Sequence, residues 1–297
     1  MKWEDRERSQ NVDDRRESSG DNGGSRGLPS MGMMMFVWPL IRPLLRTKTG
    51  WLIIGIGALL YFSGFNPLKF VGMDSSSGTT VANKAEDDKQ ATFISTVLSD
   101  TEHVWQDIFM QTYGKNYTKP QVVLYRGSTH SGCGGASAEM GPFYCPTDAK
   151  VYVDLGFFDE LAQKHGATGD FTKAYVLAHE IGHHIQNLQG TLDKAHSFQA
   201  SNSKTDSNAV QVRIELQADC YSGVWANQAQ KRYRMLEAGD IEEALNAASA
   251  IGDDVLQKQA QGYVSPDSFT HGSAAQRSEW FKRGFEQGTL EACNTFK

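Results

Sequence analysis

The sequence HEIGH at positions 179–183 constrains the fold of this 297-residue chain more than any other feature. It lies in a stretch, 172–189, whose apolar residues recur with the period of a helix packed inside a domain. Residues four apart on a helix lie about 40° apart around its axis, so His179 and His183 direct two imidazoles towards one point. This is the spacing of two zinc ligands. The alternative is a pair of surface histidines on an amphipathic helix.

The glutamate within the motif has the position of a general base. Glu180 is one step round the helix from His179, so it can take a proton from a water molecule without binding the metal. A zinc ion that takes part in catalysis has three protein ligands and one open position. Gln189 stands where one zincin subclass has its third histidine, so the third ligand is expected from elsewhere in the chain.

Two acidic residues in a second predicted helix, 208–234, are the candidates for completing the site. Glu215 and Asp219 are also four apart and lie among apolar residues. Buried acids are costly unless they are paired or bind a metal. We therefore expect Glu215 to be the third ligand and Asp219 to accept the far N–H of a ligating histidine. In the alternative, both acids face solvent or pair with Arg213.

His271 stands just before a further predicted helix, 273–286, which carries Arg277. A donor beside the metal would stabilise the oxyanion formed when water attacks a carbonyl, and His271 or Tyr263 fits this role. A capping or core histidine is the alternative for His271. The residue that follows the second motif histidine points about 100° away from it, and four further histidines have no partner pattern. The histidines that are therefore not expected to bind the metal are His184, His103, His130, His165 and His196.

The four cysteines are candidates for two disulfide bonds. Cys133 and Cys145 bracket a Gly-rich stretch, and closing it would remove about 3 kcal/mol of unfolded-state entropy. Cys220 and Cys293 would tie the acid-bearing helix to the C-terminal tail. Three pairings are possible, and buried free thiols or a cysteine-containing metal site are alternatives. Disulfides persist only in an oxidising compartment.

A run of apolar and neutral residues, 49–68, contains no charged side chain. As a helix, these residues would cover about 30 Å, the thickness of the hydrocarbon core of a bilayer. One transmembrane helix is expected here, with a buried helix as the alternative. Arg42, Arg46 and Lys48 crowd its N-terminal side, and Lys69 follows it. The positive-inside rule then predicts a single-pass protein with a cytoplasmic N-terminus and an extracytoplasmic domain.

The remaining segments differ in composition. Residues 1–48 are predicted to be disordered or to lie at the membrane interface, and 69–90 to be a flexible linker. The domain itself is expected at 91–297. The net charge of −6 gives no overall basic field that would attract nucleic acid. The expected partners are a protein or peptide substrate and, through the one span, membrane lipid.

The expected fold class is α+β, predominantly helical with a small sheet. Short strands are predicted at 121–127 and 150–157, with a Gly-rich loop between them. The strand sequence VYVDL is a candidate for aligning an extended substrate by edge pairing. From residue 171 onward the pattern is mainly helical, at 172–189, 208–234, 241–260 and 273–286.

The chain resembles the bacterial neutral zinc metallopeptidase family over nearly its whole length, in several long sequence segments. They include NVDDRR, MGPFYCPTDAKVYVDLGFF, HEIGHHIQ, ELQADCYSGVWA and PDSFTHGSAAQR. The family is similar to gluzincins, in which an H-E-x-x-H helix and an E-x-x-x-D helix share one zinc ion. The resemblance implies a zincin-like domain, His179, His183 and Glu215 as ligands, Glu180 as base and Asp219 behind the ligands.

The resemblance also bears on His271 and on activity. HtpX-like membrane peptidases have a T-H-P sequence followed by an arginine, and here the corresponding residues read Thr270, His271 and Gly272, followed by Arg277. Glycine replaces proline in that word. Together with the predicted span and its flanking charges, the resemblance leads us to expect a membrane-anchored, zinc-dependent endopeptidase of the bacterial inner membrane, with its domain in the periplasm. The alternative is a zinc-containing envelope adaptor or assembly protein that cuts nothing.

Overall fold

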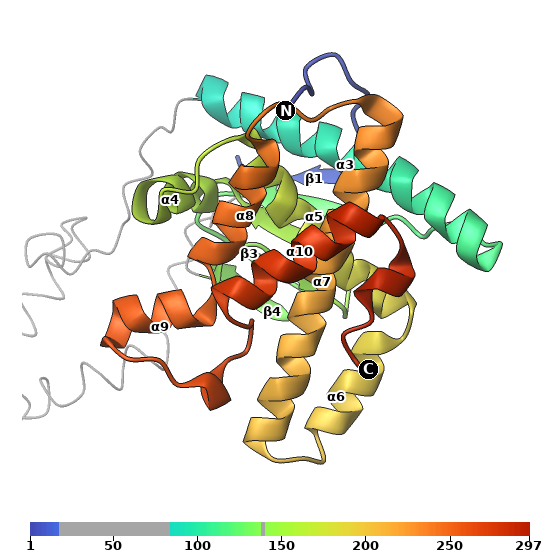
Figure 1. Ribbon diagram of the computed structural model, residues 1–297. Helices are drawn as coiled ribbons and strands as arrows, with labels where there is room; N and C mark the ends of the chain where they lie inside the picture. The colour runs from blue at the N-terminus through green and yellow to red at the C-terminus, as the bar shows by residue number, and fades with distance from the viewer. Residues whose placement is uncertain (18–83, 138–139) are drawn as a thin grey trace, which may run out of the picture. The chain divides into compact units, whose positions relative to one another are not determined.

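The computed structural model describes residues 1–17, 84–137 and 140–297 of the chain (Figure 1). The predicted transmembrane helix, 49–68, lies outside these described residues. Within the described ranges, no helix combines the length and the apolarity that a bilayer crossing needs. The architecture of this part is α+β and mainly helical, as the sequence predicts.

A mixed four-stranded sheet has the strand order β1-β2-β6-β5. The strands β1 (Val12–Asp14), β2 (Gln121–Tyr125) and β6 (Lys150–Asp154) are parallel to one another. At the other edge, β5 (Phe143–Cys145) runs antiparallel to β6. The two strands predicted from the sequence therefore lie side by side in the centre of the sheet.

The sequence of the two central strands matches their burial on both faces. Val122 pairs in register with Val151, and both side chains belong to the main hydrophobic core. The next pair, Val123 and Tyr152, faces a second, smaller core. Side chains alternate between the faces of a strand, so a strand that is covered on both faces needs an unbroken apolar run.

The helices pack on the face of the sheet that carries the main hydrophobic core, and α7 packs against both α5 and α10 (Figure 1). Two short 3₁₀ turns, Pro266–Ser268 and Leu290–Cys293, follow α9 and α10. The α-helices are α3 (Lys84–Tyr113), α4 (Leu155–His165), α5 (Asp170–Leu188), α6 (Thr191–Gln199), α7 (Lys204–Tyr233), α8 (Asp240–Ala250), α9 (Asp253–Gln261) and α10 (Ala274–Gln287).

Two glycines let α7 and α10 approach more closely than side chains would allow. A Cβ on Gly223 would lie 2.1 Å from the carbonyl oxygen of Phe281. A Cβ on Gly284 would lie 2.0 Å from the carbonyl oxygen of Cys220. Because only hydrogen fits at both places, Arg277 of α10 comes within hydrogen-bonding distance of Asp219 of α7.

The predicted helix 241–260 is divided in two by a turn at Gly252. A Cβ there would lie 2.4 Å from the backbone nitrogen of Ala274, at the start of α10. The residue is therefore a site of close contact between backbones rather than a helix interior. Hydrophobic periodicity alone does not reveal such a contact.

The N-terminal residues 1–17 are ordered, which corrects the expectation of disorder for this part of 1–48. Trp3 is buried, its ring packs edge-on against Phe93, and its indole N–H donates to Asp170. Ser9 and Asn11 donate hydrogen bonds to a buried glutamate of α3, and β1 follows directly. Strand pairing and long-range polar bonds order a segment whose composition is polar.

β1 makes residues 1–17 part of the same compact unit as residues 85–297. The amino group of Met1 also bonds the carboxylate of Asp240, 3.1 Å away. A cytoplasmic N-terminus with a domain on the opposite side of a membrane is incompatible with this pairing, because strands that share hydrogen bonds lie in one compartment.

The segment 84–90, expected as linker, is also part of the folded domain. It forms the first turns of α3, and Gln90 in it is buried. The Gly-rich stretch, expected as loop, contains a hairpin of β3 (Ser128–Ser131) and β4 (Gly134–Ser137), and then β5. The domain thus begins earlier, and its sheets are more extensive, than the sequence predicts.

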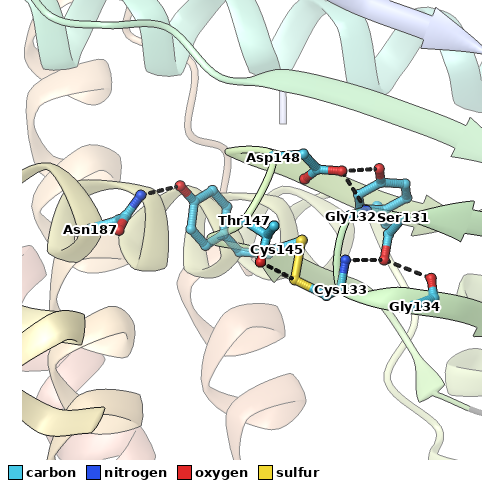
Figure 2. The surroundings of a disulfide bond; sticks show 10 residues. Ser131, Gly132, Cys133, Gly134, Cys145, Thr147, Asp148 and Asn187 are labelled. Carbon is cyan, nitrogen blue, oxygen red and sulfur yellow. Dashed lines mark hydrogen bonds between the residues drawn. A yellow bond between two sulfur atoms is a disulfide. The ribbon is translucent and has the colours of Figure 1, made fainter. Parts of the chain in front are cut away.

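Both expected disulfide pairs are formed, Cys133 with Cys145 and Cys220 with Cys293. Figure 2 shows the first of them, which joins the hairpin of β3 and β4 to the edge strand β5. The carboxylate of Asp148 supports the same turn by accepting from the backbone N–H of Gly132, 2.7 Å away. The second disulfide ties the 3₁₀ turn at the C-terminus to α7.

Candidate metal centre

Three side chains from two helices converge where the sequence predicts. α5 presents His179 and His183, and α7 presents Glu215. Oε2 of Glu215 lies 3.2 Å from Nε2 of His179 and 3.6 Å from Nε2 of His183. The three ligand atoms all lie within 4.8 Å of one another.

These distances fit a zinc ion. Tetrahedral zinc with bonds of about 2.0–2.1 Å to nitrogen and oxygen separates its ligand atoms by about 3.3–3.4 Å. The two separations from Glu215 lie on either side of that value. Two imidazoles and a carboxylate are also the donor set of a common class of catalytic zinc site.

A buried ion pair lies behind His179. Oδ1 of Asp219 lies 2.8 Å from Nδ1 of this histidine, which donates its N–H. Arg277 donates to both oxygens of Asp219, over 2.9 and 3.0 Å, and the hydroxyl of Tyr175 donates to Oδ1 over 2.6 Å. With Nδ1 held in this way, Nε2 of His179 is directed at Glu215.

The acids of α7 are buried, contrary to the alternative that they face solvent. Asp219 is fully buried and Glu215 is 7% exposed. Arg213 is exposed and does not pair with either of them. The second oxygen of Glu215, Oε1, accepts a hydrogen bond of 2.9 Å from Nε2 of Gln211.

Both acids of α7 stay ionised because positively charged groups lie against them. Burial would raise the pKa of Asp219, but Arg277 and then His179 outweigh it and hold the pKa at about 2. Burial would lower the pKa of His179, but the carboxylate of Asp219 raises it to about 10. Glu215 also keeps a lowered pKa despite burial, because the charge of His183 outweighs it. The anionic forms of both acids are therefore stable here.

Glu180 lies beside the converging donors and is available as a base. It is 7% exposed and lines the cavity in front of them. Burial raises its pKa, and the positive charges of His183 and His179 only partly oppose this. A carboxylate with a raised pKa is better suited to accept a proton near neutral pH.

The converging residues open into a cavity of about 400 Å³. Most of its wall is apolar and comes from the segment around β5 and from α5, α6, α7 and the α8–α9 turn. The lining residues other than those described above are Met140, Gly141, Pro142, Phe143, Tyr144, Pro146, Phe157, Val176, Leu192, Ala195, His196, Ile214, Ile251, Leu256 and His271.

His271 lies on the cavity wall, as a candidate oxyanion donor should, and also has a structural partner. Its Nδ1 lies 3.2 Å from Oδ1 of Asp253, which raises the pKa of the histidine. The backbone N–H groups of Thr270 and His271 donate to the other oxygen of Asp253. Tyr263 is exposed and is not part of the wall.

The other histidines stand apart from the three donors. His184 is buried and bonds the hydroxyl of Tyr144 and the carbonyl oxygen of Thr118. His196 is exposed and contributes to the cavity wall. Of the remaining three, His103 is half-buried, His130 is exposed and the side chain of His165 lies outside the described residues.

The strand expected to pair with substrate is not available for this role. β6, which contains the first four residues of VYVDL, pairs with β2 on one side and β5 on the other, so both of its edges are occupied. β5 is the edge strand of this sheet, and Phe143 and Tyr144 in it line the cavity. Sequence order alone does not show which strand lies at an edge.

Three other contributors to the site belong to no recognisable motif in the sequence. They are Tyr175, Gln186 and Gln211, and with Arg277 they hold Asp219, His183 and Glu215 in place. The only signal in the sequence was spacing, because Gln211 and Tyr175 each lie one helical turn before a ligand. Burial of the arginine depends on the packing of α10, which local patterns do not encode.

An H-E-x-x-H helix whose two histidines meet a glutamate from a later helix defines the class of zinc-dependent peptidases. The chain belongs to the family described as "Putative neutral zinc metallopeptidase", which matches residues 1–296.

Two relatives are similar over most of the chain. "Uncharacterized protein YpfJ" of Escherichia coli K12 is 45% identical over 301 residues, which cover 100% of this chain and 99% of the relative. "Uncharacterized protein Rv2575" of Mycobacterium tuberculosis H37Rv is 42% identical over 208 residues, or 67% of this chain and 68% of the relative. No solved structure matches the chain.

Proposed function

We propose that the protein is a zinc-dependent endopeptidase that binds one zinc ion through His179, His183 and Glu215. The observation that carries this proposal is the convergence of these three donors on one point, beside a fourth group, Glu180, that remains free. Structural zinc sites are closed by four protein ligands, whereas catalytic sites have three. Membership of the zinc metallopeptidase family supports the same assignment.

The residues around the cavity have separate roles in the proposed hydrolysis. When bound, zinc supplies Lewis-acid polarisation of the scissile carbonyl and lowers the pKa of water. Glu180 takes the proton of the attacking water and then passes it to the leaving amine. His271, protonated more readily because of Asp253, donates to the oxyanion that develops on the carbonyl. Arg277 keeps Asp219 ionised and so fixes His179.

The substrate is proposed to be an extended segment of a protein or peptide. The free edge of β5 offers backbone groups for pairing, and the cavity beside it has apolar walls. The net charge of −6 gives no overall basic field that would attract nucleic acid.

The domain is proposed to act outside the cytoplasm of a bacterial cell, at the inner membrane. Two disulfides support an oxidising compartment. Residues 1–17 are proposed to share that compartment, because β1 belongs to the sheet of the domain. A single crossing by 49–68 would put 1–17 and the domain on opposite sides of the membrane, so contact of 49–68 with lipid stays a prediction from sequence without the single-pass topology.

The test compares zinc-loaded wild-type protein with Glu180→Gln on a broad panel of unfolded proteins and peptides. We expect the variant to bind one zinc ion per chain and to cleave about 10²–10⁴-fold more slowly. Glu279→Gln, at an exposed position of α10, is the matched control and should cleave like wild type. If wild type and Glu180→Gln both bind zinc and neither cleaves anything, the adaptor alternative replaces this proposal.

A further inference from the structure

A chain of side-chain amides leads away from His183 into the interior. Nδ1 of His183 lies 2.8 Å from Oε1 of Gln186, which is fully buried. Nε2 of Gln186 donates to the backbone carbonyl of Ile214, over 2.7 Å, and to Oε1 of Gln217, over 3.0 Å. Nε2 of Gln217 in turn donates to the backbone carbonyl of Cys293, over 3.0 Å.

The far end of this chain fixes the direction of every hydrogen bond in it. A backbone carbonyl can only accept, so Gln217 must turn its NH₂ group towards Cys293 and its oxygen towards Gln186. Gln186 then faces two acceptors, the carbonyl of Ile214 and the oxygen of Gln217, and must direct its NH₂ group at them. Its own oxygen is left for His183, whose Nδ1 must therefore carry a proton.

The reversed arrangement is strongly disfavoured. If Gln186 were flipped, its oxygen would face the carbonyl of Ile214 and the oxygen of Gln217, and two buried acceptors would lose their donor. Each buried polar group left without a partner costs about 1–3 kcal/mol. A proton on Nδ1 leaves the lone pair on Nε2, the nitrogen that faces Glu215.

We propose that Gln186 and Gln217 are positioning residues that set the tautomer and ring orientation of His183 for zinc, with the Cys293 carbonyl as the fixed end. This inference rests on the zinc site of the proposed function. The fixed end is held covalently, because Cys293 is bonded to Cys220 on α7, the helix that also carries Glu215 and Gln217. His179 is oriented by a buried ion pair and His183 by neutral amides.

The competing explanation is that the two glutamines only fill buried polar space. That role predicts a loss of stability on substitution but no specific effect at the metal. The matched control is Gln228→Met, because Gln228 also lies on α7 and also donates to a backbone carbonyl of the C-terminal segment, that of Gly288, over 2.6 Å. It makes no contact with the chain of amides just described.

The experiment measures zinc affinity by chelator competition in full-length wild type, Gln186→Met, Gln217→Met and Gln228→Met. Removing a partner behind a metal-bound histidine weakens metal binding by about 10–100-fold, so we expect this loss for Gln186→Met. The zinc affinity of Gln217→Met should lie between those of Gln186→Met and wild type, because Gln186 keeps its hydrogen bond to the carbonyl of Ile214. Gln228→Met should match wild type.

A second readout does not depend on affinity or on cleavage. In ¹⁵N-histidine-labelled, zinc-loaded protein, the Nδ1–H proton of His183 should exchange slowly with water, and faster in Gln186→Met than in Gln228→Met. Equal affinity and equal exchange rates in these two variants would overturn the proposal. If Gln186→Met fails to fold, the same comparison is made with Gln217→Met. A wild type that binds zinc and shows the protected proton but cleaves no peptide would sustain this inference while refuting the proposed function.

Discussion

Nδ1 of His179 lies 2.8 Å from Oδ1 of Asp219, and both residues are almost completely buried. His179 directs its other nitrogen at the metal position, whereas Asp219 contacts the histidine from behind and does not reach that position. Since Arg277 holds both oxygens of Asp219, the orientation of His179 depends on α10 as well as on its own helix.

Asp219→Ala should weaken zinc binding by about 10–100-fold without removing a ligand. The reason is that His179 loses the acceptor that fixes Nδ1–H, so its ring is free to rotate and to change tautomer. Chelator competition on the folded protein measures the change, with Asp193→Ala, at an exposed position of α6, as the control. Unchanged affinity would reject a positioning role for Asp219.

Arg277→Met should lower the free energy of unfolding by about 3–5 kcal/mol, because it leaves a buried carboxylate without its cationic partner. The double variant with Asp219→Asn should lose less than the sum of the two single losses, since neither partner then remains charged and unpaired. Urea unfolding of the four proteins checks this. Strict additivity would show that the two side chains do not act as a pair.

His271 and Asp253 should make stability depend on pH. The pKa of His271 is raised from 6.5 by Asp253, so its contribution is complete below about pH 6.5 and is lost as the pH rises through the raised value. Asp253 has a pKa lowered from 3.8 by its partner His271, against burial, so its contribution is complete above about pH 3.8 and is lost as the pH falls through the lowered value.

The pair therefore contributes most at mildly acidic pH. His271→Gln should cost more stability at pH 5.5 than at pH 8.5, as measured by urea unfolding at the two values. His130→Gln, at an exposed position, should cost the same at both. A cost for His271→Gln that grows towards pH 8.5 would contradict the assignment of the ion pair.

The first seventeen residues should share a compartment with the domain. All four cysteines are in disulfides, so an introduced cysteine is the only free thiol. Arg8→Cys and Asn202→Cys place one at an exposed position in each part. A membrane-impermeant thiol reagent should label both variants or neither in intact cells. Labelling of only one variant would show that a membrane separates the two positions.

Removing the disulfide of the hairpin, by Cys133→Ser with Cys145→Ser, should lower stability by about 3 kcal/mol. Because Cys145 ends the edge strand that lines the cavity, we also expect a higher KM and a smaller change in kcat. Thermal unfolding and steady-state kinetics with a cleaved peptide measure the two effects. An unchanged KM would indicate that β5 does not align the substrate.

The sequence predicts the centre of the site better than its surroundings. Spacing on a helix is a local property, so the positions of His179, His183, Glu215 and Asp219 follow from the two helices alone. The burial of Arg277 does not, because it depends on the glycine-mediated contact between α7 and α10. In the sequence, Gln186 looks like any other helix residue. Its role becomes visible only from the long-range contacts with Gln217 and, through it, Cys293.

The fold shows the same division between local and long-range information. The central strands and the long helices have clear periodicity, and both disulfide pairs were among the candidates. β1 has three residues, two of them acidic, and becomes a strand only through its partner at 121–125. The helical pattern is interrupted at Gly252, where the backbone comes into close contact with the start of α10. Both features depend on residues far away in the sequence.

Because β1 and the buried tryptophan precede a long intervening stretch, the folding unit is discontinuous along the gene. A fragment that starts at residue 84 would lack an edge strand and would leave the partners of Trp3 uncovered. Conversely, a protease that nicks the polypeptide between residues 17 and 84 would produce two pieces that stay associated. Recombinant work on this protein should therefore keep the N-terminal peptide, or supply it in trans.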